Sequence, residues 1–152
     1  MRGPNGEELP SAVLFACTFN AVRSPMASAI MRHLYGRCVY VHSAGARAGE
    51  LDPMAGEVME EIGIEIGKHK PRRFEDLEDT SFDLVIALSP QAQHKAVELT
   101  RTMAVEVEYW PTQDPTAVEG SRDQQLDAYR AVRDELMRRI RARFSVDRAG
   151  DA

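Results

Sequence analysis

The sequence predicts an α/β fold in which a four-stranded parallel sheet is flanked by helices on both faces. Short runs of uninterrupted apolar residues, such as 13–16 and 84–88, alternate along the chain with longer segments of helical apolar spacing. Strands that are apolar throughout are typical of parallel sheets, which are buried on both sides. Alternating strands and helices join through right-handed crossovers, and ligands bind such sheets beyond the carboxyl ends of the strands.

Helix starts are marked by a capping residue followed by proline, at Ser24-Pro25, Asp52-Pro53 and Ser89-Pro90. Proline suits the first helical position because its missing N–H would be unpaired there, and the Ser or Asp side chain accepts from a free amide. Gly36 and Gly63 are expected to end the first two helices. In chain order we expect strand 13–16, helix 25–35, strand 39–42, helix 53–62, strand 84–88, helix 90–100 and strand 105–110.

The last helix is predicted to begin after Ser121. Ser121 and Gln124 have the spacing of a capping box, in which each side chain bonds the other residue's backbone amide. Apolar residues then recur at helical spacing and should form the inward stripe of this helix: Leu126, Tyr129, Val132, Leu136, Ile140 and Phe144.

Length and composition indicate one globular domain. The chain has 152 residues, 43% of them apolar, and a net charge of −5. We expect residues 11–146 to form the domain and the Gly-, Pro- and Glu-rich residues 1–10 a loose arm. The acidic balance argues against a nucleic-acid or membrane-surface binder. With no long apolar run or signal peptide, we expect a cytoplasmic protein.

The loop between the first strand and the first helix is the candidate active site. A tight loop closing on a helix N-terminus directs unpaired amides at one centre, which suits a tetrahedral oxyanion. Cys17 lies at its mouth, where a helix N-terminus and a nearby arginine favour the nucleophilic thiolate. We expect the following residues to bind phosphate: Thr18, Phe19, Asn20, Ala21, Val22, Arg23 and Ser24.

Individual residues of this loop suit separate tasks. Arg23 offers a planar fork that holds two oxygens of a phosphate group through the reaction. The hydroxyl of Ser24 can donate to the sulfur of Cys17 and stabilise it as a thiolate. Asn20 tolerates the positive φ that a nest-forming loop needs. Outside the loop, Asp114-Pro115 is by itself more typical of a structural turn, and the alternative is that Asp114 is the general acid for the leaving group.

The loop string CTFNAVRSPMA resembles the phosphate-binding loop of the low-molecular-weight protein tyrosine phosphatases and the related arsenate reductases. Further motifs of that family follow at similar spacing: Ser43-Ala44-Gly45, His69-Lys70-Pro71-Arg72, Phe82-Asp83-Leu84-Val85 and Asp114-Pro115. The resemblance covers nearly the whole chain. It implies a flavodoxin-like three-layer fold, Cys17, Arg23 and Asp114 as catalytic residues, and Ser43 and His69 as supports of Asn20.

The pattern departs from the family at several positions. Many of its phosphatases have glycine and a second cysteine where this chain has Phe19 and Val22, and aromatic residues where it has Thr116 and Ala117. Arsenate reductases that recycle through thioredoxin carry two more cysteines after the third strand, where this chain has none. Cys38 is predicted to lie near the amino end of the second strand, more than ~10 Å from Cys17. A disulfide needs Cα atoms within about 7 Å, so the two cysteines should not be bonded. We expect Cys38 to be an inert packing residue.

Three functions remain open on these grounds. We favour a phosphomonoester hydrolase that acts on aryl phosphates or phosphotyrosine, in a small molecule or a protein, through a cysteinyl-phosphate intermediate. The alternative is an arsenate reductase that uses an external thiol. The third is a non-catalytic oxyanion-binding module, which would need neither a thiolate nor an acid. We expect no cofactor and no metal, since no Cys/His cluster has zinc-like spacing.

Overall fold

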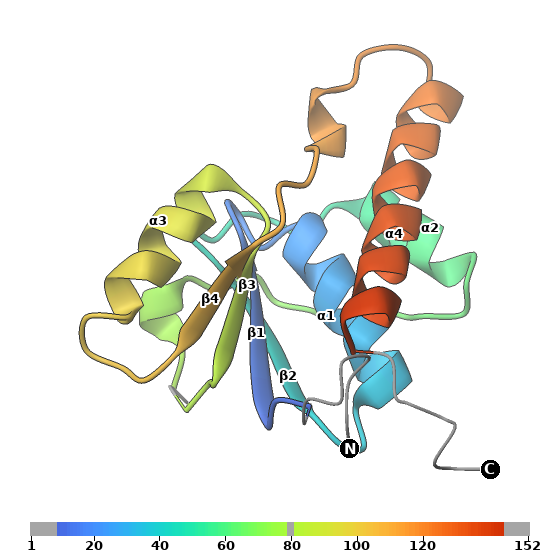
Figure 1. Cartoon of the computed structure of the whole chain (residues 1–152). Helices are drawn as coiled ribbons and strands as arrows, with labels where there is room; N and C mark the ends of the chain where they lie inside the picture. Colours follow the sequence, from blue (N-terminus) through green and yellow to red (C-terminus); the bar gives the residue numbers. More distant parts are fainter. Residues whose placement is uncertain (1–8, 79–80, 145–152) are drawn as a thin grey trace, which may run out of the picture.

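The computed structural model describes residues 9–78 and 81–144, and its strands form one sheet with helices on both faces (Figure 1). Within these residues the sheet has four strands in the order β2-β1-β3-β4, and every pair is parallel. The predicted fold class is therefore confirmed. The strands are β1 (Ala12–Cys17), β2 (Tyr40–Gly45), β3 (Leu84–Ala87) and β4 (Glu106–Tyr109).

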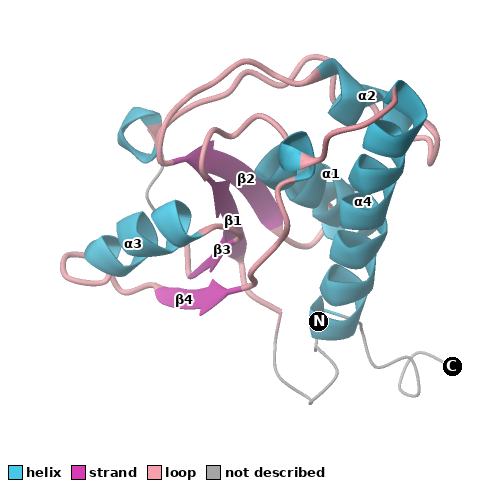
Figure 2. Ribbon diagram, turned by 90° about the horizontal axis from the view of Figure 1, so that it is seen from above, coloured by secondary structure: helices cyan, strands magenta, loops and turns pink. Residues whose placement is uncertain are grey.

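The helices divide between the two faces of the sheet. Figure 2 shows α3 on one side of the strands and α1 with α4 on the other, and α2 packs against α4. Short 3-10 turns, η1 (Phe74–Asp76) and η2 (Pro115–Ala117), lie in the connections. The helices are α1 (Arg23–Tyr35), α2 (Pro53–Glu60), α3 (Pro90–Leu99) and α4 (Arg122–Phe144).

The central strand β1 is buried along its whole length, and its side chains alternate between two apolar clusters. Val13, Phe15 and Cys17 join the larger cluster, which includes buried residues of α1, α2 and α4. Leu14 and Ala16 join the cluster that contains residues of α3. The alternation follows from the two-residue period of a strand, and it directs the thiol of Cys17 to the α1 side.

Most predicted helix starts are confirmed by their caps. The carboxylate of Asp52 accepts from the amide of Met54 at 2.9 Å, and the hydroxyl of Ser89 accepts from Ala92 at 3.3 Å. At the last helix, the amide of Ser121 donates to the side chain of Gln124 at 2.9 Å, and the amide of Gln124 donates back to the Ser121 hydroxyl at 3.2 Å. The whole predicted inward stripe of α4 is buried.

Most element ends differ from the predicted ones by one or two residues, as α2 does in ending at Glu60, and two of the differences bear on the site. Helix α1 begins at Arg23 and not at Pro25, so Ser24 lies inside the helix and does not cap it. The reason is that its hydroxyl bonds the Cys17 and Asn20 side chains, which draws the loop into the helix early. Strand β2 continues to Gly45, so Ser43 lies within it, because β2 pairs with β1 as far as Cys17.

Residues 1–8 of the predicted arm lie outside the described residues, as do residues 145 and 146 of the predicted domain. Leu9 is half-buried and packs against the larger apolar cluster. Across residues 9–78 and 81–144, no helix combines the length and apolarity that crossing a membrane requires.

Candidate active site

The loop after β1 is held in shape by the segment that follows β2. Residues 46–52 run beside residues 17–21, and their amides donate to the carbonyl oxygens of the loop. Because these carbonyls are bonded on the outer side, the amides of the loop are left to face inward. The four bonds are Ala46 N to Cys17 O (3.0 Å), Arg47 N to Thr18 O (2.8 Å), Gly49 N to Phe19 O (2.9 Å) and Asp52 N to Ala21 O (3.2 Å).

The inward amides make a site for an oxyanion. Among the described residues, the backbone amides of residues 18–23 donate to no protein acceptor. The next amide, that of Ser24, lies 3.4 Å from the sulfur of Cys17. A ring of unpaired N–H groups that ends on the N-terminus of α1 attracts negative charge by hydrogen bonding and by the helix dipole. The loop therefore forms a cradle whose geometry suits a tetrahedral oxyanion, with the thiol of Cys17 at its base.

The sulfur of Cys17 is held by a short chain of polar contacts. Cys17 is 2% exposed, and its Sγ lies 2.9 Å from the hydroxyl of Ser24. The side-chain amide of Asn20 donates to that same hydroxyl at 2.8 Å. Since the oxygen of Ser24 accepts from Asn20, its own proton can point at the sulfur at 2.9 Å, and the other acceptor within reach, the carbonyl of Ala44, is farther away at 3.4 Å. This arrangement stabilises negative charge on Cys17.

Asn20 is the central residue of this chain of contacts. Its φ of 54° is the one positive value that a non-glycine residue takes within the described chain, as the sequence predicted. Its Oδ1 accepts from the amide of Arg72 at 3.0 Å and lies 3.0 Å from Nε2 of His69. His69 Nε2 also lies 3.2 Å from the Asn20 carbonyl, and because both oxygens are acceptors, Nε2 carries the proton. Ser43 is buried nearby in β2 and is not among the partners of the Asn20 side chain.

Protonation of His69 is expected to destabilise the protein. Burial is the main cause that lowers the pKa of His69, the bond to Asn20 opposes it, and the charges of Arg72 and Arg32 lower it further. The unfolded chain therefore takes up this proton more readily, so the stabilising contribution is complete above the ordinary pKa of about 6.5 and is lost as the pH falls through the lower folded pKa. Urea unfolding between mildly acidic and neutral pH should show this decline.

The matched variant is His69→Gln, because glutamine retains an N–H that can donate to Asn20. Its free energy of unfolding should decline less steeply over the same pH range than that of the wild-type protein. Equal slopes in the two proteins would show that His69 is not the titrating group.

Arg23 lies at the rim of the cradle and is 8% exposed. Its Nη1 donates to the carbonyl of Thr112 at 3.0 Å, and its Nη2 donates to the hydroxyl of Thr18 at 3.4 Å. Thr112 follows β4, and its amide donates to the carbonyl of Leu88, the residue after β3. The guanidinium of Arg23 is thus held in position by the segment that follows β4. The sequence did not predict Thr112, because the contact uses its backbone carbonyl, which every residue type has.

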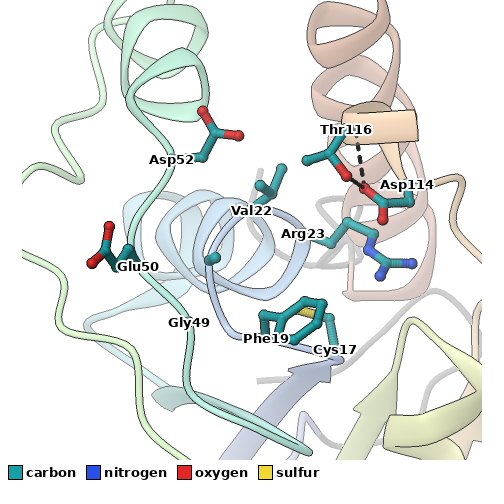
Figure 3. Close-up of a pocket in the computed structure, with 10 residues that line it drawn as sticks. Cys17, Phe19, Val22, Arg23, Gly49, Glu50, Asp52, Asp114 and Thr116 are labelled. Atoms are coloured by element: carbon teal, nitrogen blue, oxygen red, sulfur yellow. Dashed lines mark hydrogen bonds between the residues drawn. The ribbon is translucent and has the colours of Figure 1, made fainter. Parts of the chain in front are cut away.

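Asp114 lines the same pocket as Cys17 and Arg23, and it also caps η2. Its Oδ1 accepts both the amide of Thr116 at 3.0 Å and the Thr116 hydroxyl at 2.7 Å (Figure 3). Its Oδ2 accepts from no described residue. The two interpretations of Asp114-Pro115 are therefore compatible: one oxygen shapes the turn, and the other is available to a bound molecule.

A pocket of about 250 Å³ opens above the cradle. Figure 3 shows Glu50 and Asp52 on one side of it, with Asp114 and Arg23 on the other. Sequence reasoning missed both Glu50 and Asp52, although Asp52-Pro53 repeats the Asp-Pro signal of Asp114. The lining residues are Cys17, Phe19, Ala21, Val22, Arg23, Gly49, Glu50, Asp52, Asp114 and Thr116.

Asp52 differs from Asp114 in having both oxygens occupied. Its Oδ1 caps α2, and its Oδ2 accepts from the hydroxyl of Tyr129 at 2.5 Å. Burial, followed by this bond and the charges of Asp52 and Asp114, raises the pKa of Tyr129, so the phenol stays protonated and keeps donating. Asp52 therefore links α2 to α4 and is less available for proton transfer than Asp114.

Cys38 lies at the opposite end of the sheet from Cys17. It is in the turn between α1 and β2, just before the point where Tyr40 pairs with Ala12, whereas Cys17 pairs with Gly45. Five strand residues at about 3.3 Å each separate those levels by roughly 16 Å, too far for a disulfide. The predicted separation is confirmed, but the expectation of packing is wrong: Cys38 is exposed, because the α1–β2 turn lies outside the core.

The chain is similar to proteins of known family. The family model described as low molecular weight phosphotyrosine protein phosphatase matches residues 12–147. An arsenate reductase from Shouchella clausii is 34% identical over 130 residues, which are 85% of this chain and 91% of the relative. A low molecular weight protein tyrosine phosphatase from T. tengcongensis is 28% identical with a TM-score of 0.70, covering 86% of this chain and 95% of the other. An arginine phosphatase from Geobacillus stearothermophilus is 28% identical with a TM-score of 0.72, covering 88% and 90%.

Proposed function

Because the chain belongs to the low molecular weight phosphotyrosine protein phosphatase family, we propose that it hydrolyses phosphomonoesters through a cysteinyl-phosphate intermediate. Its substrates are aryl phosphates or phosphotyrosine. The observation that carries this proposal is the thiol of Cys17 at the base of a ring of unpaired amides, with Arg23 and Asp114 in the same pocket. Binding alone would need neither a stabilised thiolate nor a carboxyl group with a free oxygen.

The first step forms a bond between sulfur and phosphorus and breaks the bond to the leaving group. The thiolate of Cys17 attacks while the amides of residues 18–23 and the guanidinium of Arg23 stabilise the equatorial oxygens. Asp114 gives its proton to the departing oxygen from Oδ2. Because Oδ1 is held by Thr116, the acid keeps a constant orientation during this transfer.

The second step hydrolyses the intermediate. Asp114, now ionised, takes a proton from a water molecule, whose oxygen attacks phosphorus. The bond to sulfur breaks, and phosphate leaves. Cys17 regains its negative charge, which the hydroxyl of Ser24 at 2.9 Å stabilises, so sulfur is a better leaving group than an unassisted thiolate.

Arsenate reduction is the second candidate, because a relative that is 34% identical over 85% of this chain is named an arsenate reductase. In that reaction the thiolate of Cys17 bonds to arsenic and one As–O bond breaks, so that an oxygen of arsenate leaves as water after protonation, and a thiol then attacks the sulfur of Cys17. The electron pair of the S–As bond leaves with arsenite, and a second thiol reduces the resulting disulfide. Cys38, about five strand residues away along the sheet, cannot supply the first of these thiols, so an external thiol is required.

The two reactions are separated by assaying them side by side. Hydrolysis of p-nitrophenyl phosphate without added reductant is expected for the phosphatase. Arsenite formation that depends on glutathione or dithiothreitol, without comparable hydrolysis, would favour the reductase instead. Absence of both activities, with retained phosphate binding, would favour the non-catalytic module.

Cys38→Ser is expected to leave p-nitrophenyl phosphate hydrolysis and any thiol-dependent arsenate reduction within about twofold of wild type. The physical reason is its exposed position at the amino end of β2, while the reaction takes place at the carboxyl ends of the strands. Steady-state rates of purified wild-type and variant protein provide the measurement. Loss of arsenate reduction alone would mean that Cys38 takes part in thiol exchange.

A further inference from the structure

The pocket above Cys17 is lined by more acidic than basic side chains, although the site is expected to bind an anion. Its wall carries the carboxylates of Glu50, Asp52 and Asp114, and Arg23 is its one cationic side chain. The positive charge of Arg23 and the amides is directed at the phosphate group. The acidic side chains therefore line the part of the pocket beyond the phosphate group, where the rest of the substrate lies.

Of the three acidic side chains that line this pocket, Glu50 is the one that makes no hydrogen bond within the described protein and has no role in proton transfer. Asp52 is bonded through both oxygens, and Asp114 is assigned to proton transfer. Glu50 is exposed, and its side chain forms no hydrogen bond or ion pair with a described residue. Its backbone is nevertheless well placed, because the neighbouring Gly49 donates to the carbonyl of Phe19 at 2.9 Å. A fixed backbone therefore carries an uncommitted negative charge at the pocket.

Phe19 supplies an apolar face beside this charge. It is 48% exposed although it belongs to the phosphate-binding loop, and it lines the pocket with Cys17 (Figure 3). It leans against Gly49 closely enough that a Cβ there would lie 3.2 Å from its own Cβ. An exposed aromatic ring at the mouth of a pocket offers a surface for a planar group and, through its electron-rich face, for a cation.

Arg47, in the segment that runs beside the phosphate-binding loop, does not line this pocket. It lines a neighbouring hollow with Gln91 and Thr18, and this hollow shares Phe19, Arg23 and Asp114 with the Cys17 pocket. Arg47 and Glu50 thus line different hollows, which share the side chain of Phe19. A substrate group that extends out of the Cys17 pocket beside Glu50 therefore lies close to the negative charge of that carboxylate.

From this arrangement we propose that Glu50 selects substrates in which the phosphorylated ring carries a positive charge close by. In a protein substrate this is a phosphotyrosine next to lysine or arginine. The inference rests on the proposed phosphatase function and adds the charge of the preferred substrate. Phe19 packs against the ring, and Glu50 attracts the cation beyond it.

A matched pair of small substrates tests this selection. 4-(Aminomethyl)phenyl phosphate and 4-(carboxymethyl)phenyl phosphate place opposite charges at the same position, each separated from the ring by one carbon. We expect kcat/KM to favour the ammonium compound by about two- to fivefold, the range of an exposed charge pair, with most of the difference in KM. The preference should shrink as ionic strength rises.

Glu50→Gln is expected to remove most of this preference, and Glu50→Lys to reverse it. Glu60→Gln is the control, since Glu60 is also exposed, forms no ion pair with a described residue and lies at the end of α2 outside the pocket. It should retain the wild-type preference. Equal preference in wild type and Glu50→Gln would overturn the role of Glu50. Failure of wild type to hydrolyse either compound in a Cys17-dependent manner would instead overturn the proposed function.

Discussion

Cys17→Ser is expected to abolish hydrolysis of p-nitrophenyl phosphate while the protein still binds phosphate or vanadate. A serine alkoxide is nearly unpopulated at neutral pH, so the nucleophile is lost, with an expected fall in kcat of at least about a thousandfold. The unpaired amides of residues 18–23 and the guanidinium of Arg23 do not depend on the sulfur and remain to hold the anion. Turnover assays and calorimetric titration with phosphate measure the two effects separately.

The control for this variant is Cys38→Ser, which makes the same chemical change at the exposed cysteine. A folded Cys17→Ser protein that retained more than a tenth of wild-type hydrolysis would show that Cys17 is not the nucleophile. Loss of phosphate binding together with turnover would show that the sulfur is needed to form the cradle. Either result is distinct from misfolding, which urea unfolding of the variant detects.

Asp114→Asn is expected to slow substrates with basic leaving groups far more than activated ones. A p-nitrophenolate departs readily without a proton, whereas a tyrosine phenolate or an alkoxide does not. General acid catalysis contributes about 10²- to 10⁴-fold, so the wild-type to variant ratio of rates should rise steeply with the pKa of the leaving group. Asparagine retains an oxygen that can accept the bonds from Thr116, so the cap of η2 is expected to survive.

Rapid-quench measurement of the cysteinyl-phosphate should be used, because hydrolysis of the intermediate can limit the steady-state rate and hide the slope. Asp52→Asn is the matched control: Asp52 also lines the pocket and caps a helix, but both of its oxygens are bonded. Asp52→Asn should lower the free energy of unfolding, because it weakens the bond to Tyr129. Its effect on the reaction rate should not depend steeply on the pKa of the leaving group. A flat ratio for Asp114→Asn would remove Asp114 from the acid role. Glu50 would then be the next candidate, since it lines the pocket, whereas Glu119 and Asp123, the acidic residues that follow Asp114 along the chain, do not.

Local patterns in the sequence determined the fold class, the helix starts at Asp52 and Ser89, and the loop around Cys17. These features depend on neighbouring residues: a continuous apolar run specifies a strand buried on both faces, and a capping side chain before proline specifies a helix start. The positive φ of Asn20 was predictable for the same reason, because it follows from the conformational range of asparagine within a tight loop.

Tertiary structure alone decided which distant groups meet at the site. Thr112 fixes Arg23 through a carbonyl oxygen, and Asp52 enters the pocket because residues 46–52 run beside the loop of Cys17. The exposure of Cys38 likewise depends on how the α1–β2 turn lies against the core. Such contacts join segments far apart in the chain, and many join through backbone atoms that every residue possesses. Local residue patterns therefore contain no signal for them, and only the packing of the sheet and helices brings them together.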